Sequence, residues 1–383
     1  MEKKLLLVIN EDRFFLSHRS QIALLAKEKG WNVTLVTKNT GRRQEIEEMG
    51  IKYIELPINP TGMNPKDEMK LFKFLQDLFK KYPDSVIHLV GLKNMLWGGL
   101  ASRMVKTKGV LYAVSGLGTL FGENKNKLIS STIQSLLKIG MRGKNVAVIF
   151  QNHDDEKLFQ DSGIANKCFR FFIKGSGVDL KQYSPKQNKE NKPLKIIFTA
   201  RMLREQGVED LVAAAEILRQ DYEGKIEFLL CGDLSSNPNA LTKEDLESMT
   251  DGNYIKWLGH RTDIPKLLAD SDIMCFPSFY REGVPKSLIE ASACGLPIIT
   301  TDSVGCRDTV IPKKNGYLVP PHSPAEIAKY LRKLIENPEI RKKMGLKSRQ
   351  IAEKEYDVNA VAKKHLEIYN LLYVFEKNKQ NEK

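Results

Sequence analysis

Short apolar runs alternate with amphipathic stretches along the chain, a pattern that predicts buried strands separated by helices. In the first half the apolar runs are LLLVI (5–9), VTLVT (33–37), YIEL (53–56), SVIHLV (85–90), GVLYAVS (109–115) and VAVIFQ (146–151). Near-continuous apolar strands joined by helical crossovers are typical of a parallel sheet covered by helices on both faces. The first half is therefore predicted to form a doubly wound α/β domain.

The pattern is interrupted at residues 174–193, where glycine, proline and charged residues dominate, as in an interdomain linker. It then resumes with the runs LKIIFTA (194–200), KIEFLLCG (225–232), YIKWLG (254–259), IMCFPS (273–278) and PIITT (297–301). A second α/β domain of the same class is therefore predicted, with the domain boundary near residue 180.

From about residue 323 onward the chain is predicted to be helical. The last helical stretch, NAVAKKHLEIYNLLYVF, carries apolar residues at steps of three and four, which gives the helix an apolar stripe. This stripe needs a groove in which it can be buried. The stretch is followed by the polar tail EKNKQNEK.

The length of 383 residues and the apolar content of 42% suffice for two cored domains. No apolar run reaches 18 residues, and the first run is too short for the core of a signal peptide, so the chain is expected to stay in the cytoplasm. The five cysteines never form a C-x-x-C pair, which argues against a disulfide framework and a zinc site. Buried thiols are expected at Cys168, Cys231, Cys275, Cys294 and Cys306.

The formal net charge of +13 is concentrated in the first half of the chain. Residues 93–149 hold nine lysines or arginines and one acid, Glu123, so this segment is expected to meet a phosphate-rich partner. Nucleic acid, an anionic membrane surface and a diphosphate-bearing substrate all fit, as does a basic face that meets only water. Residues 128–143 are amphipathic, which suits a membrane interface, although a core-facing helix has the same pattern.

The stretch REGVPKSLIEASACGLPIIT (281–300) places two glutamates, with seven residues between them, around the start of a predicted helix. Ligands of open α/β sheets bind beyond the carboxyl ends of the strands, and this stretch follows the strand run at 273–278. Pro285 suits the first position of the helix, and Gly295 with Pro297 ends it. The free N–H groups at such a helix start form a site for a phosphate or a diphosphate.

The two carboxylates have different distances to this anion site. Glu282, in the loop before the helix, would lie beside whatever group the diphosphate carries. Glu290 lies about five residues into the helix, roughly 7–8 Å along its axis, which is about the distance from a diphosphate to a ribose. Ribose hydroxyls are natural donors to a carboxylate. The stretch therefore indicates a site for a nucleoside diphosphate and the group attached to it.

These residues resemble the retaining glycosyltransferases of family 4, whose mark is a glutamate, seven residues and a second glutamate. The similarity extends over ARMLREQGVEDL (200–211), residues 257–310 and NGYLVP (315–320). The first half is similar to a branch of the family that extends sugars on polyprenyl diphosphate, through FFLSHR (14–19), SGLGTLF (115–121) and VIFQNHDD (148–155).

The resemblance implies the GT-B fold, in which two Rossmann-like, doubly wound parallel-sheet domains face each other across a cleft and the C-terminal helix packs back on the N-terminal domain. The expected segments are an acceptor and membrane-side domain at 1–180, a nucleotide-sugar donor domain at 181–357, and the returning helix with its polar tail at 358–383.

The resemblance also implies roles around the two glutamates. Glu290 is expected to hold the ribose. Glu282 is expected to act in catalysis, meeting the donor sugar beside the N–H groups of Gly283 and Val284. Pro285 completes this donor-binding turn at the start of the helix.

Other donor contacts are implied at the strand-end loops. Arg201 would clamp the diphosphate and is the second expected catalytic residue, and His260 with Arg261 would lie near the nucleobase. Gln206 departs from the family pattern, which usually has lysine there as a second cation on the diphosphate. Either Arg204 or the helix N-terminus would replace that charge, or donor affinity is lowered.

Acceptor contacts are expected in the N-terminal domain, where the Gly-Gly loop of the wider family is missing. The candidates for the acceptor or the cleft are Ser17, His18, Arg19, Ser115, Gly116 and Asn152. His18 and His88 are the histidines expected in the cleft, whereas His322 and His365 are expected on the surface. The cations expected to face an anionic membrane are Lys125, Lys127, Lys138, Arg142 and Lys144.

Two acidic clusters have the appearance of metal ligands. DSD (270–272) is similar to the metal-binding D-x-D of the other glycosyltransferase fold, and HDD (153–155) groups three possible ligands. The first lies between a helix and a strand, and the second follows a strand at a point where such residues cap helices, so neither is interpreted as a metal site. No metal and no cofactor are expected besides the UDP-sugar donor.

The sequence thus predicts a retaining hexosyltransferase that moves a sugar, an N-acetylhexosamine, from a UDP-sugar to a polyprenyl-diphosphate-linked saccharide in the assembly of bacterial surface polysaccharide or glycan. It would act at the inner face of the cell membrane. A family 4 transferase with a free or phosphorylated small acceptor is the alternative, and a sugar-nucleotide epimerase shares the two-domain architecture. A nucleic-acid binder is suggested only by charge, because the chain has no RNA- or DNA-binding motif.

Overall fold

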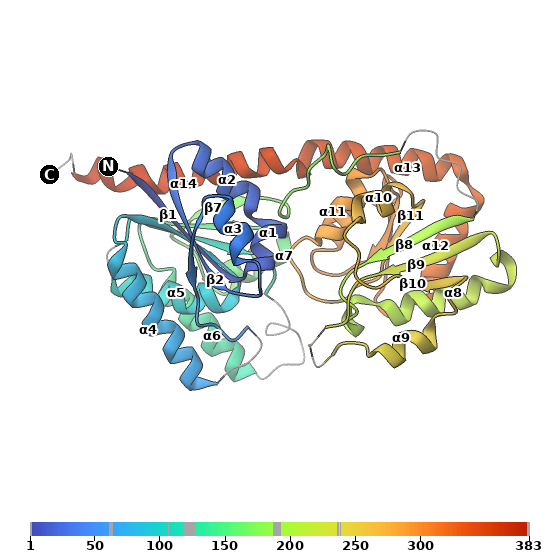
Figure 1. Ribbon diagram of the computed structural model, residues 1–383, viewed down its shortest axis with the longest axis horizontal. Helices are drawn as coiled ribbons and strands as arrows, with labels where there is room; N and C mark the ends of the chain where they lie inside the picture. Colours follow the sequence, from blue (N-terminus) through green and yellow to red (C-terminus); the bar gives the residue numbers. More distant parts are fainter. Residues whose placement is uncertain are drawn as a thin grey trace. The chain divides into compact units, whose positions relative to one another are not determined.

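The computed structural model describes residues 2–60, 64–105, 107–117, 127–186, 193–235, 237 and 239–380. It divides into two compact units: Met1–Ser176 with Val358–Lys383 form the first, and Gly177–Asp357 forms the second. Each unit is built around one parallel sheet, which runs from blue to green in the first unit and from green to orange in the second (Figure 1).

The sheet of the first unit has seven parallel strands in the order β3-β2-β1-β4-β5-β6-β7. The strands are β1 (Lys3–Glu11), β2 (Trp31–Lys38), β3 (Lys52–Glu55), β4 (Ser85–Val90), β5 (Gly109–Val114), β6 (Val146–Phe150) and β7 (Phe169–Phe172). Each apolar run predicted in the first half overlaps one of β1 to β6. The edge strand β7, FRFF, is half-buried or exposed along its length and has no counterpart among the predicted strands.

Helices cover both faces of this sheet. They are α1 (Asp12–His18), α2 (Ser20–Glu28), α3 (Arg43–Glu48), α4 (Pro65–Lys81), α5 (Leu92–Met104), α6 (Lys127–Gly140) and α7 (His153–Asp161). Successive side chains of a strand point to opposite faces, so β1 contributes side chains to two cores. Leu5, Leu7 and Ile9 join the core beneath α2, whereas Leu6 and Val8 join the core beneath α4, α5 and α6.

The C-terminal helix α14 (Val358–Gln380) packs on the first unit, against α2 and over β4, β5 and β6. Its buried residues recur at steps of three and four along the helix: Val361, Ala362, His365, Ile368, Tyr369, Leu372 and Tyr373. The groove that the apolar stripe requires therefore lies on the α2 face of the first sheet.

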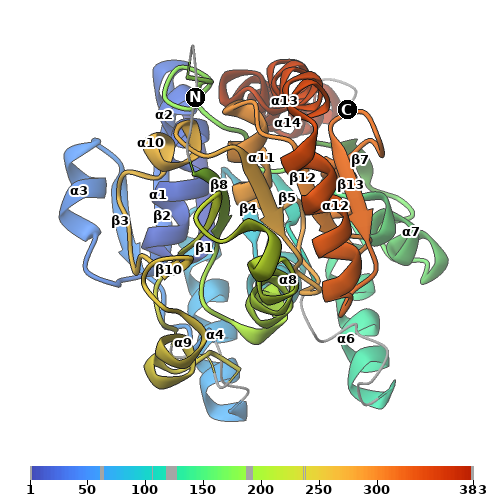
Figure 2. The same ribbon diagram turned by 90° about the vertical axis from the view of Figure 1, so that its right-hand side faces the viewer.

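The second unit has six parallel strands in the order β10-β9-β8-β11-β12-β13. The strands are β8 (Leu194–Thr199), β9 (Ile226–Cys231), β10 (Ile255–Trp257), β11 (Ile273–Phe276), β12 (Ile298–Thr301) and β13 (Gly316–Val319). Its α-helices are α8 (Val208–Tyr222), α9 (Lys243–Met249), α10 (Ile264–Ala269), α11 (Lys286–Ala293), α12 (Pro324–Glu336) and α13 (Pro338–Ile351). Short helical turns are η2 (Arg204–Gln206), η3 (Arg307–Thr309) and the π-turn η4 (Ala352–Tyr356). Figure 2 views this unit from its own side, where α8 and α12 are neighbours.

The predicted fold class is confirmed, because both units are doubly wound parallel sheets and the C-terminal helix packs on the first. The helix predicted to begin at Pro285 begins at Lys286, with Pro285 as its N-cap. Four of the five cysteines are buried, Cys168 is half-buried, and all five thiols are free. Within the described part of the chain, no helix combines the length and the apolar character needed to span a membrane.

Candidate functional site

The candidate site of the second unit lies where its strand order reverses. β8 lies between β9 and β11, so the chain builds β9 and β10 on one side of β8 and β11 to β13 on the other. Doubly wound sheets bind ligands beyond the carboxyl ends of the strands at this switch point. The loops that follow β8 and β11 there carry Arg201, Gln206 and Glu282.

Backbone hydrogen bonds hold these two loops together. The carbonyl of Glu205 accepts hydrogen bonds from the backbone N–H of Phe279 (2.9 Å) and of Tyr280 (3.1 Å). Gly207 then turns the chain into α8 with a φ of 79°, and a Cβ there would lie 2.2 Å from the carbonyl oxygen of Pro277. The close approach of the two loops therefore requires glycine at position 207.

This approach brings Gln206 to Glu282. The Gln206 amide Nε2 donates a 2.6 Å hydrogen bond to Oε1 of Glu282, and Gln206 is 3% exposed. Burial raises the pKa of Glu282, and the Gln206 hydrogen bond and the charge of Arg201 oppose that rise. The structure thus brings together three of the residues that the sequence assigns to the donor.

The turn from Glu282 to α11 is tightly enclosed. Gly283, Val284 and Pro285 are buried, and Gly305, in the loop after β12, has a φ of 83°. A Cβ on Gly305 would lie 1.6 Å from the carbonyl oxygen of Gly283. The loop after β12 therefore fixes the backbone whose N–H groups open α11, a contact between distant segments that sequence reasoning missed.

Glu290 lies on the second turn of α11, with its side chain 12% exposed. Burial raises the pKa of this carboxyl, and Lys286, with Nζ 4.0 Å from Oε1, together with the hydroxyl of Tyr183 opposes the rise. Tyr183 precedes the second sheet in the chain, in the segment expected to be a linker. It is a further candidate that the sequence pattern did not indicate.

The other cations assigned to the donor have carboxylate partners. Arg204 pairs with Glu209 and, at 2.8 Å, with Asp245, so its charge is already neutralised. Arg261 makes a bidentate contact with Asp263 at 2.8 and 2.7 Å. His260 is exposed next to it, in the loop after the edge strand β10. Arg201 is exposed at the end of β8, close enough to Glu282 to influence its pKa.

In the first unit the strand order reverses between β1 and β4, and α1 follows β1. Ser17 is exposed and its Oγ lies 2.6 Å from Nδ1 of His18, whose ring stacks on Phe14 with centroids 4.1 Å apart. Ser17 and His18 thus remain at the surface of α1. Arg19, by contrast, is only 2% exposed, which does not favour a contact with a phosphate in solution.

Arg19 is buried near His88 of β4 and His365 of α14, where this helix packs on the sheet. His88 and His365 are 0% and 1% exposed, with ring centroids 5.7 Å apart, and Nδ1 of His88 lies 2.8 Å from the hydroxyl of Tyr369. The expectation that His365 lies on the surface is therefore wrong, because it occupies one of the buried positions of the helix stripe. His88 likewise belongs to the core and not to an open cleft.

The remaining candidates of the first unit lie after β5 and β6. Ser115 is half-buried and Gly116 has a φ of 108°. Asn152 is buried as the N-cap of α7, where its side chain accepts a 2.7 Å hydrogen bond from the backbone N–H of Asp155. Its Nδ2 donates to the Asp155 carboxylate at 3.0 Å. Asn152 therefore caps the helix, and HDD (153–155) forms its first turn.

The amphipathic helix of the basic segment turns part of its apolar face inward. Ile133, Leu137 and Met141 are buried in the core beneath α4 and α5, so the core-facing interpretation holds for them. Lys138 and Arg142 are exposed on the outer side, as is Lys144. Lys125 and the side chain of Lys127 lie outside the described residues.

The two acidic clusters have structural partners. Asp272 accepts a hydrogen bond from the backbone N–H of Lys195 at 2.9 Å, and Asp270 pairs with Lys186 at 2.6 Å. Among the described residues no group of three or more His, Cys, Asp or Glu side chains is arranged to hold a metal ion.

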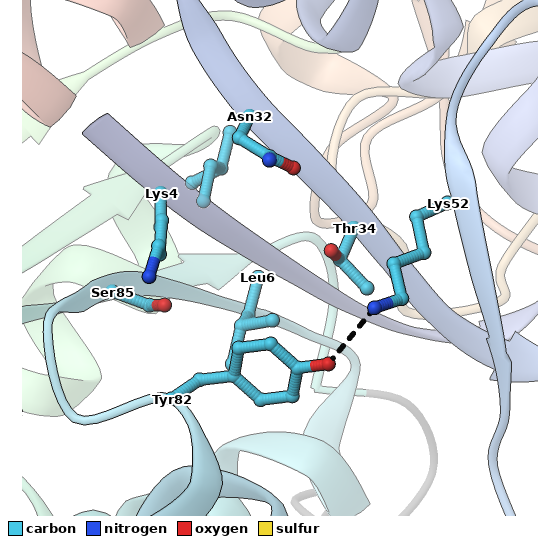
Figure 3. Close-up of a pocket in the computed structure, with 8 residues that line it drawn as sticks. Lys4, Leu6, Asn32, Thr34, Lys52, Tyr82 and Ser85 are labelled. Carbon is cyan, nitrogen blue, oxygen red and sulfur yellow. Dashed lines mark hydrogen bonds between the residues drawn. The ribbon is translucent and has the colours of Figure 1, made fainter. Parts of the chain in front are cut away.

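A small pocket of the first unit lies at the opposite edge of its sheet, away from the switch point. Figure 3 shows it lined by residues at the amino ends of strands, with Lys52 Nζ donating a 3.1 Å hydrogen bond to the hydroxyl of Tyr82. Lys4, Asn32 and Ser85 lie at the starts of β1, β2 and β4. Ligands of such sheets bind at the carboxyl ends, so this pocket is not a candidate active site.

Two models of glycosyltransferase sequence families match the chain, one in each unit. The model described as "Glycosyl transferase 4-like" matches residues 4–152, and "Glycosyl transferases group 1" matches residues 179–351. The second match contains the whole switch-point site described above.

Curated relatives and solved structures agree with these matches. An N,N'-diacetylbacillosaminyl-diphospho-undecaprenol alpha-1,3-N-acetylgalactosaminyltransferase of Campylobacter jejuni is 27% identical over 380 residues, which cover 93% of this chain and 97% of the relative. A UDP-Gal:alpha-D-GlcNAc-diphosphoundecaprenol alpha-1,3-galactosyltransferase of Escherichia coli is 24% identical over 310 residues, or 78% of each chain. The structure of a sucrose-phosphate synthase of Thermosynechococcus elongatus superposes with a TM-score of 0.79 at 20% identity, covering 97% of this chain and 99% of the other.

The fold, the glutamate pair at the switch point and the two matching models lead to one assignment. The chain belongs to the retaining glycosyltransferases of family 4 and has their GT-B fold.

Proposed function

We propose that this enzyme transfers an N-acetylhexosamine from a UDP-sugar to a polyprenyl-diphosphate-linked saccharide at the inner face of the cell membrane, in bacterial surface glycan assembly. The observation that carries the donor half is the placement of Glu282 and Glu290 on either side of the N-terminus of α11, at the switch point of the second sheet. The acceptor half is supported by the Campylobacter and Escherichia coli relatives, whose names specify undecaprenyl-diphosphate-linked saccharides.

Each part of the donor, namely the diphosphate, the ribose and the sugar, would have its own contact in the site. The positive end of α11 and the guanidinium of Arg201 would take the diphosphate. Glu290 would accept hydrogen bonds from the ribose hydroxyls, and Glu282 would face the sugar. The enclosed backbone at Gly283 and Val284 would keep their N–H groups in place for the developing charge.

The proposed chemistry is a front-face displacement. The bond between the anomeric carbon and the diphosphate oxygen breaks, and the acceptor hydroxyl forms its new bond on the same face of the sugar. The departing diphosphate oxygen takes the proton of that hydroxyl, so no side chain has to serve as nucleophile or base. Arg201 and the helix N–H groups would stabilise the diphosphate, and the Glu282 carboxylate the positive charge on the sugar.

Product analysis tests this function. The purified protein is incubated with pooled UDP-sugars and a short-chain prenyl-diphosphate-linked aminosugar, and the lipid products are examined by mass spectrometry. A gain of one N-acetylhexosamine on the lipid is expected. Transfer to a free or phosphorylated sugar alone would favour the small-acceptor alternative, and an altered UDP-sugar formed without acceptor would favour an epimerase.

Membrane contact is proposed through the exposed cations of α6 and the turn after it. Replacing Lys138, Arg142 and Lys144 with serine is expected to weaken binding to anionic vesicles about a hundredfold, because each such charge contributes about 1 kcal/mol near an anionic surface. Vesicle flotation at two salt concentrations measures the effect, which high salt should diminish.

A matched control removes three exposed lysines of the second unit, Lys342, Lys343 and Lys354. This variant has the same change in net charge and should float with anionic vesicles as the wild type does. Equal losses in both variants would indicate a general effect of net charge, and unchanged flotation of the α6 variant would remove the proposed contact.

A further inference from the structure

Gln206 has one polar atom that the site leaves unused. Its Nε2 donates to Glu282, but among the described residues no hydrogen bond reaches its carbonyl oxygen Oε1. The residue is 3% exposed, so bulk water does not supply the partner. Buried polar atoms of folded proteins are rarely left in this state, so Oε1 calls for a partner that the described residues do not supply.

The orientation of the amide follows from the chemistry of its neighbour. An ionised carboxylate only accepts hydrogen bonds, so the NH₂ end of Gln206 faces Glu282 and the carbonyl end faces away from it. Glu205 anchors this turn by accepting hydrogen bonds from the loop after β11, which fixes where the amide can reach. Oε1 is therefore a positioned hydrogen-bond acceptor next to the carboxylate proposed to face the sugar.

We propose that Gln206 is a specificity-determining residue, whose Oε1 accepts a hydrogen bond from a hydroxyl or amide N–H of the transferred sugar while its Nε2 orients Glu282. This inference rests on the proposed UDP-sugar function. It assigns Gln206 a contact with the sugar in place of the diphosphate contact that a lysine makes in similar enzymes.

The diphosphate and the ribose are unsuitable partners for Oε1. Ionised phosphate oxygens are acceptors only, so they repel a carbonyl oxygen. The ribose hydroxyls have their proposed partner in Glu290, on the second turn of α11 and away from the loop that carries Glu282. The sugar offers several hydroxyls, and an N-acetyl sugar adds an amide N–H, at the place where Glu282 is directed.

Calorimetry with UDP, UDP-N-acetylgalactosamine and UDP-N-acetylglucosamine tests this assignment. Gln206→Lys keeps a donor toward Glu282 but has no acceptor, and Gln206→Met is a neutral variant of similar size. In both variants the Kd of the UDP-sugar relative to the Kd of UDP is expected to rise about three- to tenfold. The ratio cancels any gain in diphosphate affinity from the new lysine. Because Gln206→Lys keeps a donor to Glu282, its ratio separates the loss of Oε1 from a displaced Glu282.

Gln220→Lys is the matched control, because it makes the same change on the exposed side of α8 and should leave both affinities unchanged. Circular dichroism verifies the fold of each variant. If the wild type binds UDP and a UDP-sugar and both Gln206 variants keep its affinity ratio, this inference alone is overturned. A bound water would then be the partner of Oε1. Wild-type protein that binds none of the three nucleotides would overturn the proposed function and the inference with it.

Discussion

Replacing Glu282 with glutamine is expected to slow sugar transfer about a hundred- to a thousandfold while the affinity for UDP stays near that of the wild type. The amide has nearly the same shape as the carboxylate but lacks the negative charge that would stabilise the sugar cation. Since Glu282 precedes α11 and UDP would contact the helix end, its loss should affect the reacting centre more than the nucleotide. Steady-state kinetics of UDP release with acceptor, and calorimetry with UDP, measure the two effects.

Glu290→Gln provides the contrast to this variant. A ribose hydroxyl bonds more strongly to a charged carboxylate than to a neutral amide, so the affinity for UDP itself is expected to fall about tenfold or more. A Glu282→Gln enzyme with the wild-type transfer rate would contradict the catalytic assignment. Unchanged UDP affinity in Glu290→Gln would contradict the ribose assignment.

The melting temperatures of both variants serve as a further control, because the direction of their change can be predicted. Burial raises the pKa of Glu282 and Glu290, so each folded carboxyl binds its proton more readily than in the unfolded chain. Their ionisation therefore destabilises the ligand-free fold as pH rises through these raised pKa values. Both amide variants should consequently melt at or above the wild-type temperature near pH 7.5, and a lower melting temperature would indicate damage to the fold.

Strands with continuous apolar runs could be predicted from the sequence, because both of their faces are covered by helices. The two strands without a predicted counterpart are both edge strands. β7 (Phe169–Phe172) has no buried residue, with Arg170 exposed and its three phenylalanines half-buried. β13 (Gly316–Val319) begins at a glycine whose Cβ would lie 1.9 Å from the carbonyl oxygen of Ile298. Their strand character depends on the neighbouring strand more than on their own composition.

The glutamate pair could be predicted because its members share one short segment with a helix start. The contacts that complete the site come from distant segments, and no local pattern indicates them. Tyr183 reaches Glu290 from before β8, and Gly305 meets Gly283 from beyond β12. Similarly, the pairing of Arg204 with Glu209 and Asp245 depends on how η2, α8 and α9 pack, which the order of charges along the chain does not determine.

Acid is expected to weaken the first unit, because His88 of β4 and His365 of α14 are buried where this helix packs on the sheet. Burial, with a smaller contribution from the charge of the nearby Arg19, lowers the pKa of His88 far below its usual value and that of His365 to about 3. In the unfolded chain both rings protonate near pH 6.5, so the unfolded state binds more protons below that pH. The contribution of this pair to stability is therefore complete above pH 6.5 and is lost as pH falls. At pH 5.5 each histidine lowers the free energy of unfolding by about 1.4 kcal/mol, and the pair lowers it by about 3 kcal/mol.

Hydrogen exchange of the α14 amides, corrected for the intrinsic effect of pH, measures this loss between pH 7.5 and pH 5.5. Protection is expected to fall steeply in the wild type and in His153→Gln, whose ring in the same unit is 72% exposed. Substituting glutamine at both His88 and His365 removes the groups that take up protons, so its protection should change little with pH even if it starts lower. If the double variant loses protection as steeply as the wild type, the acid sensitivity arises elsewhere. If it does not, proton uptake at His88 and His365 controls how firmly α14 is held on the first sheet.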